Sequence, residues 1–251
     1  MILFSFIYFL TGTIFTFLCI IVSFSIYPFI RIFSKKYASY LMHSTAKFWG
    51  RGLMKMAFIS FNVEGKENYD PDKTYLLAPN HQSSFDIFAC LSIFKKSYAF
   101  VSKDTYGKVP LFGFGMSLAD YIFVKRGTAG AVKSIDDMEE RLKNNTSIVI
   151  YPEGTRSISG DIKKPKRGIL KIAERCPDIQ ILPVVIYGTK DIMRANCIII
   201  NPFKKITVRF LEPFYFNKIE GGDNAKLDYW YNIMTENYNK LKNDYNSENI
   251  N

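Results

Sequence analysis

The chain has 251 residues, of which 48% are hydrophobic and 16% aromatic, and its formal net charge is +10. A chain of this length and composition can bury one sizeable core, and its positive charge suits nucleic acid, an anionic membrane surface or a phosphorylated substrate. The basic residues are spread along the sequence and accompany no recognition motif, which argues against a nucleic-acid partner.

The chain begins with a long segment that has no charged side chain before Arg31. Ile, Leu, Phe and Val dominate residues 2–26, and roughly 20 such residues are enough to enter or cross a bilayer. Arg31, Lys35 and Lys36 place the rest of the chain on the cytoplasmic side by the positive-inside rule. We therefore expect a membrane-embedded helical segment in the inner, cytoplasmic membrane. Gly12-Thr13 near its middle leaves open whether this segment is one tilted span or a re-entrant hairpin.

Residues 37–57 show a second membrane feature. Aromatic and apolar side chains are interleaved there with Lys47, Arg51 and Lys55, a basic and partly amphipathic pattern that suits the lipid–water interface. An ordinary packed helix would explain the same pattern. We divide the chain into an N-terminal membrane anchor with an interfacial helix, residues 1–57, and a second domain, residues 58–251.

After residue 58 the pattern changes to short β-rich runs separated by helical stretches. The expected strands are residues 57–63, 74–78, 98–102, 121–124, 147–150, 179–187 and 206–210. The expected helices are residues 86–94, 129–143, 168–175 and 223–245. This alternation predicts an α/β fold in which helices flank a mixed, largely parallel sheet.

His81 and Asp86 are the strongest candidates for acid–base chemistry. Histidine exchanges a proton near neutral pH, and a neighbouring carboxylate fixes its tautomer and favours the imidazolium. Five positions along a helix would separate the two side chains by about 140°, so we expect His81 in a turn and Asp86 in the first turn of the next helix. A capping box from Ser83 to Asp86 is the competing explanation, in which the acid serves only the helix N-terminus.

Two further loops at the carboxyl ends of expected strands suit an anion. Arginine binds phosphate through a planar fork of donors, glycine lets the backbone approach an anion, and a threonine hydroxyl donates once more. Alone, the second loop could be a turn closed by a surface ion pair; beside His81, the two loops predict a phosphate site. The first loop carries Lys125, Arg126 and Gly127, and the second carries Glu153, Gly154, Thr155 and Arg156.

Four ordered blocks of the sequence resemble those of the glycerolipid acyltransferase family, and most closely its 1-acyl-sn-glycerol-3-phosphate acyltransferases. The similarity covers about residues 60–215. Tyr151 stands where Phe is commoner, and Lys125 precedes the expected arginine. The blocks are Asn80-His81-x4-Asp86, residues 121–126, residues 151–156 and residues 181–184, with Lys103, Pro110, Gly113 and Lys166-Arg167-Gly168 as intermediate landmarks.

The resemblance implies acyl transfer from acyl-CoA or acyl-ACP to the free sn-2 hydroxyl of 1-acyl-sn-glycerol 3-phosphate (lysophosphatidate), giving phosphatidic acid in phospholipid synthesis. His81 is then the general base, oriented by Asp86, and no covalent acyl-enzyme or further cofactor is needed. The implied partners are lysophosphatidate, the acyl thioester with acyl-carrier protein as one donor, and membrane lipid. Glycerol 3-phosphate or another lysophospholipid as acceptor, and a non-catalytic lipid-binding protein, are the alternatives.

The same resemblance assigns the binding residues. The glycerol phosphate would be held by Arg126, Gly127, Gly154, Thr155 and Arg156, while Glu153 would order that loop or contact the glycerol. Weaker candidates for contacts to the substrate or the donor are Lys103, Lys125 and Lys166.

Two other catalytic classes are poorly supported. A serine hydrolase would use a similar His/Asp pair, but the Gly-x-Ser-x-Gly elbow that carries its nucleophile is missing from the sequence. His43 and His81 are 38 positions apart and the four cysteines are scattered, so metal-ligand spacing is absent and we expect no metal. We expect His43 to be structural or interfacial and the cysteines to be reduced packing residues.

Overall fold

The computed structural model of the chain describes residues 1–95, 98–125 and 128–248. Its helices are α1 (Ile2–Phe33), α2 (Lys35–Met56), α3 (Phe85–Ile93), α4 (Asp104–Gly107), α5 (Phe112–Leu118), α6 (Thr128–Lys143), α7 (Gly168–Arg175), α8 (Thr189–Ile192) and α9 (Asp223–Glu248). Its strands are β1 (Ser60–Glu64), β2 (Tyr75–Pro79), β3 (Tyr98–Lys103), β4 (Ile122–Val124), β5 (Ser147–Val149), β6 (Gln180–Tyr187) and β7 (Lys205–Phe210). Short 3₁₀ turns lie at Lys66–Asn68 and Phe216–Lys218.

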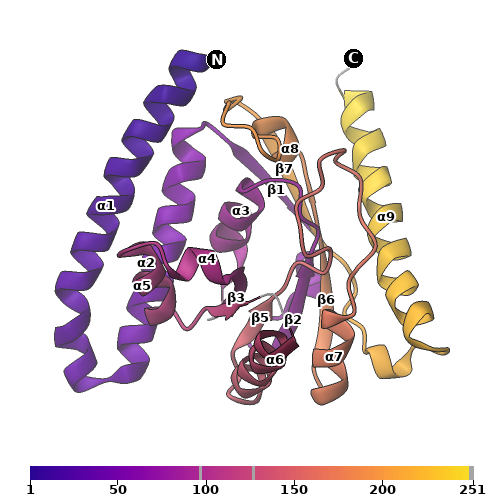
Figure 1. Cartoon of the computed structure of the whole chain (residues 1–251). Helices are drawn as coiled ribbons and strands as arrows, with labels where there is room; N and C mark the ends of the chain where they lie inside the picture. The colour runs from indigo at the N-terminus through magenta and orange to yellow at the C-terminus, as the bar shows by residue number, and fades with distance from the viewer. Residues whose placement is uncertain (96–97, 126–127, 249–251) are drawn as a thin grey trace.

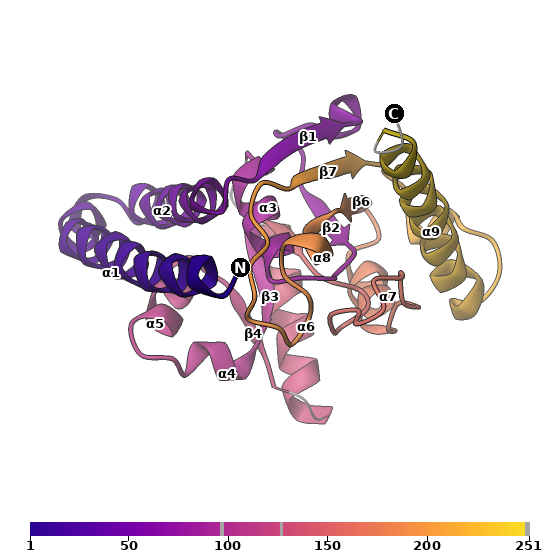
Figure 2. The same ribbon diagram turned by 90° about the horizontal axis from the view of Figure 1, so that it is seen from above.

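The described strands form one sheet in the order β1-β7-β6-β2-β5-β3-β4. Neighbouring strands are parallel except β6 and β7, which are antiparallel. Helices α2 and α3 cover one face, and α6, α7 and α9 cover the other (Figures 1 and 2). The predicted α/β fold with a mixed, largely parallel sheet is therefore confirmed.

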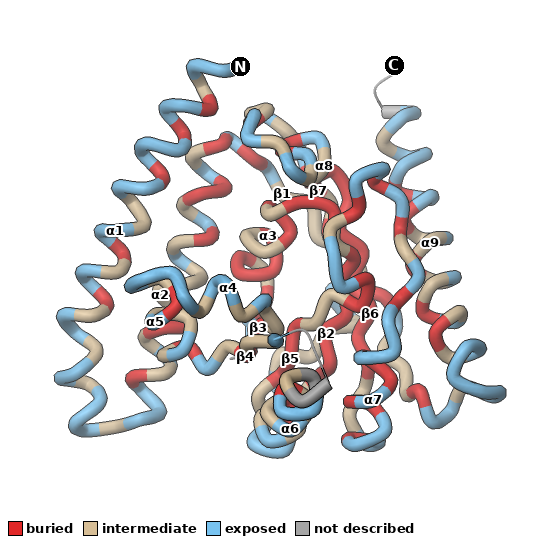
Figure 3. The backbone as a smooth tube through the Cα atoms, in the orientation of Figure 1, coloured by how far each residue is buried: buried red, intermediate tan, exposed pale blue. Residues whose placement is uncertain are grey.

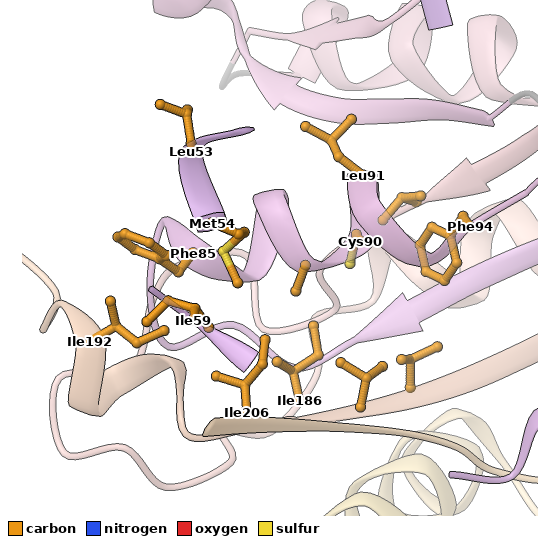
Figure 4. Close-up of a cluster of buried hydrophobic side chains, with 14 of the residues drawn as sticks. Leu53, Met54, Ile59, Phe85, Cys90, Leu91, Phe94, Ile186, Ile192 and Ile206 are labelled. Carbon is orange, nitrogen blue, oxygen red and sulfur yellow. The ribbon is translucent and has the colours of Figure 1, made fainter. Parts of the chain in front are cut away.

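A separate hydrophobic core fills each face of the sheet. On one face, Phe85 of α3 and Met54 of α2 pack toward the strands (Figure 4). On the other face, Trp230 of α9 is fully buried. Successive side chains of a strand point to opposite faces. Along β6, Leu182, Val184 and Ile186 accordingly belong to the first core, and Ile181, Val185 and Tyr187 belong to the second.

All of the expected strands and helices are present, with ends that differ by at most three residues. The sequence did not predict α4, α5 and α8, which are short. Gly107, Pro110, Gly113 and Gly115 occur in and between α4 and α5, and such residues are typical of a loop. Gly113 is needed there for close packing, because a Cβ at this position would lie 2.2 Å from the carbonyl oxygen of Gly107.

Helices α1 and α2 form an antiparallel hairpin beside the sheet domain (Figures 1 and 2). The helix α1 runs unbroken through Gly12, so the break considered at Gly12-Thr13 is wrong; the chain reverses at Ser34, whose hydroxyl accepts the N–H of Tyr37. Between the two helices, Trp49 Nε1 donates to Thr16 Oγ1 at 2.8 Å.

The outer surface of α1 is apolar and exposed. Within the described residues, α1 is the one helix that is long and apolar enough to cross a membrane, and 11% of its most apolar window is buried (Figure 3). The helix also contacts the rest of the chain near both ends. Ser5 Oγ accepts the N–H of Ile200 at 2.8 Å, and Phe24 meets Phe114 edge to face. The helix α1 therefore lies along the domain rather than projecting from it.

Candidate active site

His81 and Asp86 meet at the carboxyl end of β2. The strand ends at Pro79, His81 lies in the turn that follows, and Asp86 is the second residue of α3. His81 Nδ1 is 2.9 Å from Asp86 Oδ2, and the carboxylate has no exposed surface. The turn and the first helical turn therefore bring the pair together, as their spacing predicts.

The carboxylate of Asp86 is surrounded by hydrogen-bond donors. Its Oδ2 also accepts the N–H groups of Gln82, at 2.6 Å, and Ser83, at 2.8 Å, while its Oδ1 accepts the hydroxyl of Thr189 at 2.5 Å. An ionised carboxylate only accepts, so in a neutral imidazole the nitrogen that faces it carries the proton and Nε2 keeps its lone pair. The bond from Ser83 is one half of the capping box, and the catalytic and capping explanations are therefore both compatible with the geometry.

Two other contacts hold the His81 turn. Tyr151 stacks on the imidazole, with ring centroids 4.0 Å apart and planes at 21°. The side chain of Asn80 bonds both backbone groups of Ile186 in β6, at 2.9 and 2.7 Å. The histidine is thus fixed by the strands on both sides of β2.

Glu153 lies buried beneath the same turn, with 2% of its surface exposed. Its Oε1 accepts the N–H of His81 at 2.8 Å, and its Oε2 accepts the N–H of Lys163 at 3.2 Å. Burial raises its pKa to about 7; the two N–H donors lower the pKa in part, and the charge of Asp86 adds to the rise. The expected contact between Glu153 and the substrate does not fit this burial, and ordering of the loop is the role that the geometry favours.

The residues that follow Glu153 in this loop are less buried: Gly154 and Thr155 are exposed, and Arg156 is half-buried. Gly154 has a φ of +70°, and a Cβ there would lie 3.0 Å from the side chain of Lys166, which crosses over it. Arg156 Nη1 donates to Ser84 Oγ at 3.0 Å, and the N–H of Ser157 donates to the carbonyl of His81 at 2.8 Å. The loop is therefore tied directly to the turn that carries His81.

One cavity of about 1070 Å³ joins these groups. His81 lines it together with two kinds of side chain. The first kind is apolar and comes largely from α1, α2 and α5. The second kind is cationic. The apolar lining includes Cys19, Ile20, Phe24, Met42, Trp49 and Phe112; the cationic lining comprises Lys103, Arg156, Lys163, Lys166, Arg167 and Lys171.

Some of the predicted site residues line the cavity, and others do not. Thr155, Arg156, Lys103 and Lys166 line the cavity with His81, as does Gly154. Lys125 is exposed at the end of β4, outside the cavity lining. Arg126 and Gly127 lie outside the described residues.

The sequence did not predict two residues of the site. Thr189 follows β6, more than a hundred positions from Asp86, and no local pattern relates the two. Lys163 donates from Nζ to the carbonyl of Arg156 at 2.9 Å; the cluster of basic residues from 163 to 171 could have indicated it.

The second histidine lies apart from this chemistry. His43 is buried against Tyr98 and Tyr121. The cysteines are free. No group of three or more His, Cys, Asp or Glu that could hold a metal occurs among the residues that the structure describes.

Sequence comparisons find acyltransferases among the relatives of this chain. A protein-family model described as Acyltransferase matches residues 60–187. The chloroplastic 1-acyl-sn-glycerol-3-phosphate acyltransferase LPAT1 of Arabidopsis thaliana is 32% identical over 169 residues, which are 66% of this chain and 46% of that protein. A 1-acyl-sn-glycerol-3-phosphate acyltransferase of Borreliella burgdorferi is 30% identical over 148 residues, 57% of each protein. The chain spans about half the length of the curated relatives it matches.

The fold is also similar to a solved structure. The crystal structure of the 1-acyl-sn-glycerophosphate (LPA) acyltransferase PlsC from Thermotoga maritima matches with a TM-score of 0.79 and 22% sequence identity. The match covers 96% of this chain and 97% of that one, so it includes the hairpin of α1 and α2 as well as the sheet.

Glu153→Gln should change how stability depends on pH. Because the pKa is raised from 4.5 to about 7, the folded protein binds the proton more tightly than the unfolded chain, and wild-type stability falls as the pH rises through this window and then levels off. Glutamine does not titrate. The difference in free energy of unfolding between the two proteins should therefore change by on the order of 3 kcal/mol across the window. Urea titrations in detergent at several pH values measure it; a constant difference would contradict the raised pKa.

Proposed function

The chain belongs to the acyltransferase family, and on this premise we propose that it transfers an acyl chain from an acyl thioester to the free sn-2 hydroxyl of 1-acyl-sn-glycerol 3-phosphate, giving phosphatidic acid. The names of its relatives support this acceptor. The observation that carries the proposal is the shared cavity, which His81, several cations and apolar side chains line together. A lysophosphatidate offers the matching groups, namely a hydroxyl, a phosphate and an acyl chain.

We infer that His81 acts as the general base through Nε2, which has no hydrogen-bond partner among the described residues. As the acceptor hydroxyl attacks the thioester carbonyl carbon, Nε2 takes its proton and Asp86 stabilises the imidazolium. When the tetrahedral intermediate collapses, the C–S bond breaks and the departing thiolate takes the proton back from Nε2. Base assistance of this kind contributes roughly 10²- to 10⁴-fold to the rate. No covalent acyl-enzyme is formed.

The cations that line the cavity would hold the glycerol phosphate. One donor of Arg156 is bonded to Ser84, close to His81, which leaves the rest of its guanidinium fork for phosphate oxygens. Lys163 and Lys166 border the same loop and add positive charge. Further proposed contacts to the substrate or to the donor, whether acyl-CoA or acyl-ACP, are Thr155, Arg126, Gly127, Lys103 and Lys125.

The membrane lipid would meet the chain along α1. Its exposed apolar surface suits lipid, while its contacts with the domain at Ser5 and Phe24 keep it alongside the sheet. The hairpin of α1 and α2 would therefore enter the cytoplasmic membrane from its inner surface, with the domain outside it. Since apolar side chains of both helices line the cavity together with His81, the same cavity would accept acyl chains.

His81→Ala should abolish phosphatidate formation, because it removes the proposed acceptor of the hydroxyl proton. We expect a fall in kcat of roughly 10²-fold or more with lysophosphatidate and a labelled acyl thioester in detergent. His43→Leu is the matched control, since His43 lies outside the cavity lining, and it should keep its activity. Undiminished turnover in His81→Ala would exclude the base assignment.

Arg156→Ala should chiefly raise KM for the phosphorylated acceptor. Hydrogen bonds to a charged group contribute about 1.5–3 kcal/mol, which corresponds to roughly 10- to 100-fold in KM with a smaller change in kcat. Lys164→Ala removes a nearby cation that is paired with Asp228 outside the cavity, and it should leave KM unchanged. Equal acceptor KM values for the two variants would argue against the phosphate role.

A further inference from the structure

Two exposed phenylalanines stack on each other at the end of the molecule where α1 begins. Phe58 joins α2 to β1, and Phe203 precedes β7. Their ring centroids are 4.7 Å apart with planes at 14°, and 56% and 72% of their surfaces are exposed. We call this pair the aromatic ridge. It lies outside the cavity that contains His81.

Both residues of the aromatic ridge adopt a backbone conformation that disfavours them. Their φ angles are +56° and +59°, in the left-handed region where a bulky side chain is an outlier and glycine or asparagine is favoured. Hydrogen bonds hold both positions: the N–H of Phe203 donates to Ala57, and the N–H of Phe58 donates to Lys55. The fold thus exposes two aromatic rings to solvent, although the exposure of apolar surface and the left-handed backbone are both unfavourable. This indicates an apolar partner.

The aromatic ridge continues the exposed apolar surface of α1. The ring of Phe4 lies 6.4 Å from that of Phe58, and the loop before Phe203 is bonded to Ser5 through Ile200. Figure 2 shows this loop beside the N-terminus of α1. The same apolar character extends over neighbouring exposed residues, namely Ile2, Leu3 and Phe6 of α1 and Ile198 and Ile199 of the loop.

The charges around the aromatic ridge identify the partner. Lys55 and Lys205 are exposed within three residues of Phe58 and Phe203 in the sequence. Aromatic rings bordered by cations are typical of side chains that sit at the level of lipid headgroups, with the cations directed to phosphates. A bilayer surface satisfies both the apolar and the cationic requirement.

We propose that the aromatic ridge is a second lipid-contact surface, which inserts at the headgroup level of the membrane that α1 enters. The proposal rests on the membrane attachment in the proposed function but not on its chemistry. Two contacts, one along α1 and one built from segments far apart in the sequence, would fix the tilt of the domain on the bilayer.

Tryptophan probes in the full chain test the proposal. Phe203→Trp, Phe17→Trp on the exposed surface of α1, and Tyr229→Trp on α9 at the opposite flank are each reconstituted into vesicles of phosphatidylcholine and phosphatidylglycerol, with or without brominated acyl chains. The signal of the native Trp49 and Trp230 is subtracted. We expect bromine to quench the probes at 203 and 17 and to spare the probe at 229.

The pattern of quenching separates the two proposals. Quenching at 17 but not at 203 overturns the aromatic ridge and leaves the attachment through α1 intact. Quenching at neither overturns both, and equal quenching at all three also overturns a specific ridge. If the probe at 203 escapes bromine and is also shielded from aqueous acrylamide, protein covers the ridge, and a contact between copies of the chain replaces the proposal.

A paired substitution gives an independent readout. Phe58→Asn combined with Phe203→Asn removes the rings and suits the left-handed backbone, so the variant should unfold at no lower temperature in detergent. Its activity in detergent should equal that of the wild type, while its activity on acceptor embedded in vesicles should fall severalfold. An unchanged ratio of vesicle to detergent activity would overturn the proposal.

Discussion

The candidate site depends on the buried carboxylate of Asp86. A charge with no exposed surface is unfavourable unless donors surround it, and here backbone N–H groups of Gln82 and Ser83, the hydroxyl of Thr189 and the ring of His81 all face it. The same group therefore caps α3, shapes the turn after β2 and selects the tautomer of the histidine. Removing any one of these functions would disturb the others, because they share one pair of oxygens.

The strand order explains why distant segments reach this carboxylate. The strand β2 lies between β5 and β6, and all three are parallel, so the loops at their carboxyl ends open on the same edge of the sheet. The loop after β2 carries His81, the loop after β5 carries Glu153 and Arg156, and the segment after β6 carries Thr189. Glu153 then joins the first two loops by accepting the N–H of His81.

Local features of this arrangement could be predicted from the sequence, and long-range ones could not. The five-residue interval between His81 and Asp86 is enough to predict a turn followed by a helix, because helix geometry forbids any fully helical pairing. The roles of Thr189 and Tyr151 depend on which strands flank β2, and periodicity along the chain carries no information about that order. The burial of Glu153 could not be predicted either. Its neighbours Gly154 and Thr155 are exposed, and nothing in the sequence of residues 153–156 indicates which of them is buried.

The central claim is that Asp86 holds His81 with Nδ1 protonated and Nε2 free to take a proton from a hydroxyl. The ¹⁵N chemical shifts of the imidazole nitrogens test it directly. The chain has two histidines, so in the variant His43→Leu the only imidazole signals are those of His81. At a pH where the ring is neutral, we predict one protonated nitrogen, Nδ1, and one unprotonated nitrogen, Nε2. A neutral ring that carries its proton on Nε2 would contradict the account.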